Sequence, residues 1–128
     1  MRLLLDTATF IWMADGHSKL SGAARSLIAD ASNEAFLSAA SAWEIAVKHD
    51  LGRLDLRVPP DEYVAQQRQL HRIEPLPIDE AAALQVAKLP SVHRDPFDRI
   101  LIAQAILGGM AIVTLDRRIR MYPVRTVW

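Results

Sequence analysis

The 128-residue sequence has no cysteine, no excess of charge of either sign and no long hydrophobic run. The absence of cysteine excludes disulfides, a thiol nucleophile and any cysteine-ligated zinc site, and is compatible with a reducing cytoplasm. Fifteen Lys and Arg balance fifteen Asp and Glu, which taken alone argues against a partner held by bulk positive charge, such as nucleic acid. The longest uncharged stretch, residues 100–115, is shorter than the roughly 20 residues that span a bilayer. We therefore expect a soluble, cytoplasmic protein with no membrane segment.

Hydrophobic residues make up 51% of the chain, which at this length predicts one domain over residues 1–128. Short apolar runs alternate with segments of helical periodicity. The expected strands are 2–5, 35–38, 111–115 and 124–127, with 73–78 as an edge strand or extended loop, and the expected helices are 7–14, 21–31, one ending near 52, 61–70, 79–89 and 96–107. This order predicts an α/β fold, a three-layer sandwich with a mostly parallel twisted sheet flanked by helices.

Acidic residues stand where such a fold places ligands, after strands or at the starts of helices. Asp6 and Asp116 follow apolar runs, Glu44 lies shortly after a third run, and Asp98 opens a helix together with Asp95. Each has a structural alternative as a helix cap. Residues 41–44 match a capping box, and Asp95 before Pro96 is a good N-cap.

Taken together, these carboxylates favour a metal site over capping. The carboxyl ends of parallel strands share one edge of the sheet, so Asp6, Glu44 and Asp116 are expected to converge. Two carboxylates about 5 Å apart repel by roughly 3 kcal/mol at an effective dielectric of about 20. Capping does not offset that repulsion, whereas Mg²⁺ or Mn²⁺ converts it into coordination. Such an ion activates water and stabilises charge on a phosphoryl group in transfer.

Four segments spread along the chain resemble the PIN-domain ribonucleases, and within them the VapC-type toxins of toxin–antitoxin pairs. The matching segments are Leu3-Leu4-Leu5-Asp6-Thr7, residues 38–46 (SAASAWEIA), residues 93–99 (HRDPFDR) leading into 102–105 (IAQA), and Val113-Thr114-Leu115-Asp116. The resemblance implies a PIN-like fold and a metal-dependent endoribonuclease. It also implies an RNA substrate, a cognate antitoxin and a homodimer.

The resemblance further implies an acidic quartet of Asp6, Glu44, Asp98 and Asp116. Asp6, Asp98 and Asp116 are expected to hold one or two Mg²⁺ or Mn²⁺ ions, while Glu44 orients or deprotonates the attacking water. Asp95 is expected to be a cap or a support of the site. Weaker candidates for supporting the site or binding phosphate are Thr7, Arg99, Thr114 and Arg117.

Other residue types point less clearly to function. Arg94 and Arg118 join the arginines beside the site, and together they fit a groove for RNA phosphates. The four histidines show neither the spacing of a zinc-binding helix nor a catalytic constellation, so they are expected to be surface or loop residues. Trp12, Trp43 and Trp128 are candidates for base stacking, but core or interface positions are the favoured interpretation.

Competing functions are separated by the residues at the site. A phospho-acceptor receiver domain requires an adjacent acidic pair after the first strand and a lysine after a late one, where this chain has Thr7 and Asp116. A haloacid-dehalogenase-like phosphatase requires an aspartate at the position of Ala8. A non-catalytic RNA-binding domain does not require four acids at the ligand edge.

The zero net charge hides an uneven distribution. Residues 1–92 carry nine basic and twelve acidic groups, a net charge of −3, and residues 93–128 carry six basic and three acidic groups, a net charge of +3. The three late acids are Asp95, Asp98 and Asp116, all in the predicted site region. Once cations neutralise these acids, their surroundings are net positive, which makes the neutral total compatible with an RNA partner.

Overall fold

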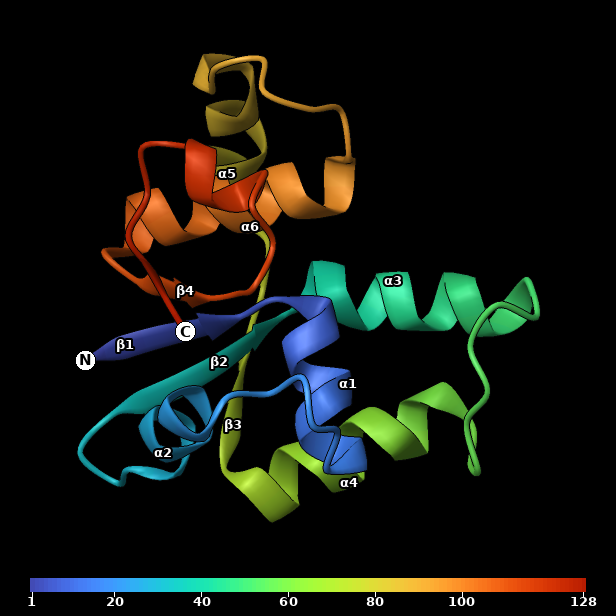
Figure 1. Ribbon diagram of the computed structural model, residues 1–128. Coiled ribbons are helices and arrows are strands. Elements are labelled where there is room, and N and C mark those ends of the chain that lie inside the picture. The colour runs from blue at the N-terminus through green and yellow to red at the C-terminus, as the bar shows by residue number, and fades with distance from the viewer.

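The computed structural model describes residues 1–128 and is built on one five-stranded sheet (Figure 1). The strand order is β3-β2-β1-β4-β5, and every neighbouring pair is parallel. The strands are β1 (Arg2–Leu5), β2 (Glu34–Ser38), β3 (Ile73–Leu76), β4 (Ala111–Val113) and β5 (Thr126–Val127). The predicted α/β class with a mostly parallel sheet is confirmed. The proline-containing segment forms an edge strand, β3, where Pro75 removes one backbone donor at little cost.

The helices connect these strands and begin at residues suited to that position. They are α1 (Thr7–Asp15), α2 (Gly22–Ala29), α3 (Ala39–Asp50), α4 (Pro60–His71), α5 (Glu80–Gln85) and α6 (Pro96–Gly108), with short 3₁₀ turns η1 (Val86–Lys88) and η2 (Ile119–Met121). Ser21 and Asp79 accept hydrogen bonds from the amides three residues later, and Pro60 and Pro96 occupy first helical positions.

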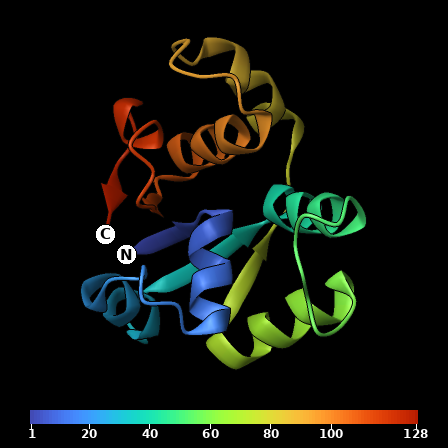
Figure 2. The same ribbon diagram turned by 45° about the vertical axis from the view of Figure 1, so that its right-hand side comes forward.

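Side chains alternate between the two faces of β1, so that this strand separates two cores. Leu3 and Leu5 lie in a cluster with residues of α1, α2 and α4, whereas Leu4 lies in a cluster with residues of α6. All three leucines are fully buried. Figure 2 shows the resulting layers, with α1, α2 and α4 on one side of the sheet and α5 and α6 on the other. The sheet is therefore covered on both faces, as parallel sheets normally are.

Several local features differ from the sequence patterns. The capping box, the structural alternative for residues 41–44, does not form, because Ser38, not Ser41, is the N-cap of α3 and the Glu44 side chain bonds to Thr7 and Lys48. The last strand, predicted over residues 124–127, is only Thr126–Val127. Strand β4 ends at Val113, two residues before the predicted end at Leu115. The helix expected over residues 79–89 divides into α5 and η1.

None of the helices is long and apolar enough to cross a lipid bilayer.

Candidate active site

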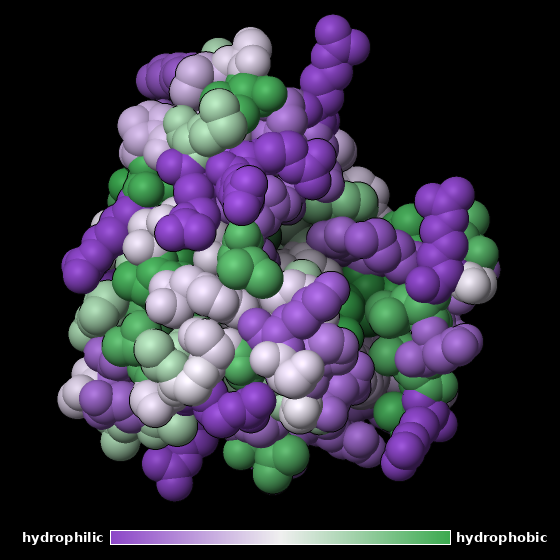
Figure 3. Space-filling model, in the orientation of Figure 1, coloured by the Kyte–Doolittle hydropathy of each residue, from purple (hydrophilic) through white to green (hydrophobic).

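A pocket of about 590 Å³ opens at the carboxyl ends of the neighbouring strands β1 and β4, and five carboxylates line it. In the space-filling view, hydrophilic side chains surround a hollow between the helices at the top of the molecule and those on its right (Figure 3). The acids that line the pocket are Asp6, Glu44, Asp95, Asp98 and Asp116. They come from the segments that follow β1 and β4, from the second turn of α3 and from the start of α6. The predicted convergence of acids at this edge is therefore what the structure shows.

Asp6 is a helix cap and a pocket residue at the same time. Its Oδ1 accepts the Thr9 amide N–H at 2.8 Å, which caps α1, and its Oδ2 accepts the Thr114 hydroxyl at 2.5 Å. The residue is only 6% exposed. Burial raises the pKa of this carboxyl, and the hydrogen bonds from Thr114 and Thr9 offset only part of that rise. Burial therefore disfavours the ionised form of Asp6, and a bound cation would stabilise that form.

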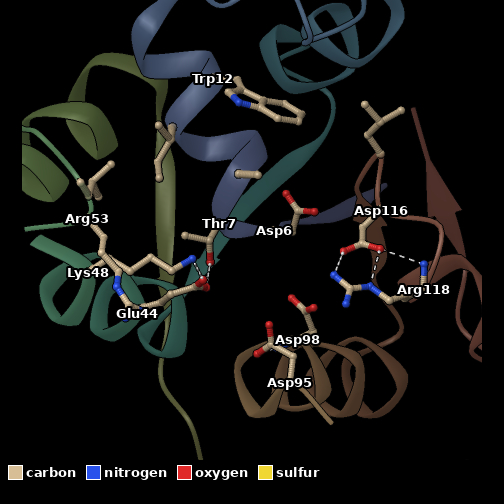
Figure 4. A pocket seen from close by; sticks show the side chains of 14 residues that line it. Asp6, Thr7, Trp12, Glu44, Lys48, Arg53, Asp95, Asp98, Asp116 and Arg118 are labelled. Atoms are coloured by element: carbon tan, nitrogen blue, oxygen red, sulfur yellow. Dashed lines mark hydrogen bonds and ion pairs between the residues drawn. The ribbon is translucent and has the colours of Figure 1, made fainter. Parts of the chain in front are cut away.

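Asp98 lies one turn into α6 and faces Asp6 and Asp116 across the pocket (Figure 4). Its Oδ2 lies 3.0 Å from Nε2 of His93. Burial raises the pKa of Asp98 to about 6, and the negative charges of Asp95 and Asp116 add to the rise, whereas the hydrogen bond with His93 lowers it. A carboxyl with this pKa among other acids is a recognised mark of a functional site.

Asp95 serves as the N-cap of α6, as its sequence context suggested. Its Oδ1 accepts the amide N–H of Phe97 at 2.9 Å and lies 3.4 Å from that of Asp98. Because Asp95 also lines the pocket, its charge contributes to the negative potential there.

Asp116 is the most exposed member of the trio that faces the pocket centre. Its Oδ1 accepts the backbone N–H of Arg118 at 2.8 Å, and its Oδ2 lies 3.4 Å from Nη2 of Arg118. Burial acts to raise the pKa of Asp116, but the hydrogen bonds and charge of Arg118 outweigh it and hold the pKa below its ordinary value. Asp116 is therefore ready to act as an ionised ligand at neutral pH.

Glu44 occupies one side of the pocket, apart from the three aspartates (Figure 4). Its Oε1 accepts the Thr7 hydroxyl at 2.7 Å, and its Oε2 forms an ion pair with Nζ of Lys48 at 2.5 Å, one helical turn along α3. Ser41 lies 2.9 Å from the Thr7 hydroxyl. Glu44 is 7% exposed, so its position is fixed by Thr7 and Lys48. The weaker candidates Thr7 and Thr114 thus contact the two acids Glu44 and Asp6.

The basic residues at the pocket are only partly those that the sequence suggested. Lys48, Arg53 and Arg118 line it. The donors of Arg99 are instead occupied by Tyr122 and by backbone carbonyls, including Val86 and Pro90 at 3.1 and 2.9 Å. Arg99 is therefore not placed to bind phosphate. Arg117 is exposed and does not line the pocket.

His93 was not recognised as a site residue from the sequence, because a single histidine in a loop carries no spacing signal. Its side chain is only 8% exposed and bridges Asp98 and the Tyr122 hydroxyl, so His93 lies in a loop, one of the two places predicted for it, but not at the surface. Among the tryptophans, Trp12 lines the pocket. Trp43 is 63% exposed and contacts the Phe97 ring edge to face, with ring centres 5.0 Å apart.

The donor set fits a hard divalent cation that keeps much of its water. Asp6, Asp98 and Asp116 offer only carboxylate oxygens and point toward a common space (Figure 4). No group of three or more His, Asp or Glu side chains lies close enough together to hold a metal ion by itself. Mg²⁺ commonly binds through one or two carboxylates and retains several waters, so an open set of this kind is suited to it.

Comparison with known sequences identifies a matching family and two relatives, one of which matches almost the whole chain. The sequence profile of the PIN domain matches residues 3–124. Ribonuclease VapC22 from Mycobacterium tuberculosis (strain ATCC 25618 / H37Rv) is 33% identical over 131 residues, covering 98% of each chain. Ribonuclease VapC16 from the same strain is 40% identical over 57 residues, covering 44% of this chain and 40% of the relative.

Solved structures with the same fold include three VapBC complexes. VapBC2 from Rickettsia felis, bound to a DNA fragment from the promoter, superposes with a TM-score of 0.74 at 14% identity, over 99% of this chain and 98% of the other. DNA-bound VapBC from Salmonella typhimurium gives a TM-score of 0.70 at 19% identity, over 99% and 97%. VapBC-1 from nontypeable Haemophilus influenzae gives 0.66 at 16% identity, over the same shares. At these identities the likeness concerns the fold alone.

Proposed function

The chain belongs to the PIN-domain family, and from that premise we propose that it is an endoribonuclease dependent on Mg²⁺ or Mn²⁺ and the toxin of a toxin–antitoxin pair. The observation that carries the proposal is the meeting of Asp6, Asp98 and Asp116 in one pocket at the carboxyl edge of the sheet. The relative that matches over its full length is a ribonuclease. The raised pKa values of Asp6 and Asp98 further support a cation as the missing partner of these charges.

Each acid has a separate task in this proposal. Asp6, Asp98 and Asp116 hold the ion, directly or through water. Thr9 and Thr114 fix the direction of the Asp6 carboxylate. The bound ion increases the acidity of water and neutralises charge on the phosphate.

Glu44 orients the attacking water and accepts its proton. Thr7 and Lys48 each hold one oxygen of this carboxylate, so its orientation is fixed. As water oxygen attacks phosphorus, the bond from phosphorus to the 3′ oxygen breaks, which leaves a 5′-phosphate and a 3′-hydroxyl. Lys48, Arg53 and Arg118 at the pocket supply positive charge along the path of the RNA backbone.

The partner of such a toxin is a second, small protein. The structural relatives include complexes of VapB with VapC, two of them bound to DNA, and we propose that this chain likewise binds a cognate antitoxin. We also propose that it forms a homodimer. Expression of the chain alone should arrest bacterial growth, and co-expression of its antitoxin should restore it. Growth that continues at the normal rate with the folded protein present would contradict the toxin role.

The proposed reaction is tested by incubating purified protein with single-stranded and structured RNA. Cleavage should occur with Mg²⁺ or Mn²⁺, stop with EDTA, and return when either ion is added in excess. Fragments should carry 5′-phosphates, seen as products that a 5′-phosphate-dependent exonuclease degrades. Cleavage that persists in EDTA, or fragments with cyclic phosphates, would contradict the proposed chemistry.

A further inference from the structure

A chain of four side chains leads from the outer surface of α6 to the acidic pocket. Nη1 of Arg99 lies 2.9 Å from the Tyr122 hydroxyl, which lies 2.8 Å from Nδ1 of His93, and Nε2 of His93 lies 3.0 Å from Oδ2 of Asp98. The rings of His93 and Tyr122 also meet at 61°, with centres 5.5 Å apart. Tyr122 is 4% exposed, so the chain is sheltered from water.

The proton positions in this chain follow from counting donors and acceptors at the Tyr122 oxygen and at Asp98. A tyrosine hydroxyl has one proton to donate and two lone pairs that accept. Arg99 can only donate, and it fills one lone pair. The backbone N–H of His93 lies 3.3 Å from the same oxygen and fills the second. The His93 carbonyl also lies 3.3 Å from this oxygen and is a second acceptor for the Tyr122 proton, so the Asp98 end of the chain decides. An ionised Asp98 carboxylate can only accept, so Nε2 of His93 carries a proton, and Nδ1 of the neutral ring accepts from Tyr122.

These bonds determine the tautomer of His93. The ring proton lies on Nε2, the nitrogen that faces Asp98. We propose that His93 is a positioning residue, which donates from Nε2–H to Oδ2 of Asp98 and thereby aims the other carboxylate oxygen into the pocket. This inference rests on the proposed function only in taking Asp98 as a metal ligand. In this proposal His93 does not bind the metal itself but orients Asp98, a carboxylate that would bind it.

The far end of the chain is anchored so that the orientation is rigid. Nη2 of Arg99 donates to the Val86 carbonyl at 3.1 Å, and Nη1 lies 2.9 Å from the Pro90 carbonyl. Arg99 thus ties the loop that carries His93 to η1 and to Tyr122. This contact explains why an arginine next to Asp98 in sequence contributes to the site without reaching the pocket.

The first test reads the tautomer directly and needs neither metal nor activity. Long-range ¹H–¹⁵N correlation spectra of the metal-free protein at neutral pH, assigned with His93→Gln, should show the His93 proton on Nε2 and an acceptor Nδ1. In Tyr122→Phe, the Nδ1 resonance should move toward that of an imine nitrogen with no hydrogen bond. Tyr63→Phe is the matched control, because the Tyr63 hydroxyl is buried without a partner. A proton on Nδ1 in the wild type, or no change in Tyr122→Phe, would overturn the proposal.

The second test measures Mn²⁺ binding by the relaxation of water protons. His93→Leu removes the donor and should weaken binding about 10-fold or more, the usual cost of losing a residue that orients a metal ligand. In His93→Gln, the side-chain amide can donate to Asp98 and should restore most of the affinity. Tyr122→Phe should weaken binding less than His93→Leu, and KM for RNA should change little in all three. Equal affinity in wild type and His93→Leu would overturn the positioning role. If the wild type binds no Mn²⁺, the proposed function fails instead, and the tautomer result still decides the direction of the His93 bond.

Discussion

Thr114, which follows β4, holds the side chain of Asp6, which follows the neighbouring strand β1. Its hydroxyl donates to Asp6 Oδ2 at 2.5 Å and accepts the backbone N–H of Asp116 at 3.0 Å. One fully buried hydroxyl therefore connects the acid that follows β1 to the acid that follows β4. The relative position of these two proposed ligands depends on this residue, although it carries no charge.

Replacing Thr114 by valine should destabilise the protein, because the substitution leaves one oxygen of a buried carboxylate without a partner. Hydrogen bonds to charged groups contribute about 1.5–3 kcal/mol, and we expect a loss of this order in the free energy of unfolding measured with urea at neutral pH. Thr114→Ser keeps the hydroxyl and should lose much less. Equal stability of Thr114→Val and Thr114→Ser would show that the bond to Asp6 contributes nothing.

Asp98 should make the metal-free protein less stable as the pH rises through about 4 to 6. Its pKa is about 6 in the folded protein and 3.8 when unperturbed, so the folded state holds its proton longer than the unfolded state and loses stability when that proton leaves. Asp98→Asn cannot ionise and should be more stable than the wild type at pH 7, by about 1–2 kcal/mol after allowance for solvent screening. Thermal unfolding in EDTA at pH 4 and pH 7 measures both effects. A melting temperature of Asp98→Asn below that of the wild type at pH 7 would contradict this electrostatic explanation.

Arg118 should compete with a cation for Asp116, because its two side-chain contacts to the Asp116 carboxylate occupy oxygens that a metal would use. Arg118→Gln should therefore bind Mn²⁺ several-fold more tightly in a titration without RNA. Arg117→Gln is the matched control, because it removes an exposed positive charge next in sequence that does not line the pocket. If the two variants bind Mn²⁺ with the same affinity, the ion pair with Asp116 does not limit metal binding.

Glu44 is expected to act on the attacking water and not on the metal, because its oxygens are held by Thr7 and Lys48 apart from the three aspartates. Glu44→Gln keeps an oxygen that accepts from Thr7 but cannot take up a proton. The variant should bind Mn²⁺ like the wild type while kcat falls about 100-fold or more, the usual contribution of a general base. A loss of metal affinity equal to the loss in kcat would instead identify Glu44 as a ligand.

The sequence was sufficient to predict the architecture and the meeting of the acids. Leu3, Leu4 and Leu5 form an uninterrupted apolar run because both faces of β1 are covered, and this pattern is visible without coordinates. The position of an acid directly after such a strand is equally visible. Since all the strands are parallel, Asp6 and Asp116 had to lie at the same edge.

Contacts between distant side chains were not predictable in the same way. The contact between His93, which also bonds to Asp98, and Tyr122 joins residues 29 positions apart in a loop and at the end of a 3₁₀ turn, for which no periodicity exists. Arg99 resembled a phosphate ligand because of its place beside Asp98, yet the first turn of α6 directs its guanidinium toward backbone carbonyls. Glu44 likewise matched a capping box, but the N-cap of the helix lies three residues earlier, at Ser38.

The most direct test of the account compares RNA cleavage by Asp6→Asn, Asp98→Asn and Asp79→Asn in Mg²⁺. Asp6 and Asp79 are both N-caps whose Oδ1 accepts an amide N–H at 2.8 Å, and asparagine caps helices about as well as aspartate, so they differ chiefly in their place at the pocket. The account predicts folded variants throughout, with cleavage abolished in Asp6→Asn and Asp98→Asn and unchanged in Asp79→Asn. Cleavage at the wild-type rate by both Asp6→Asn and Asp98→Asn would contradict it.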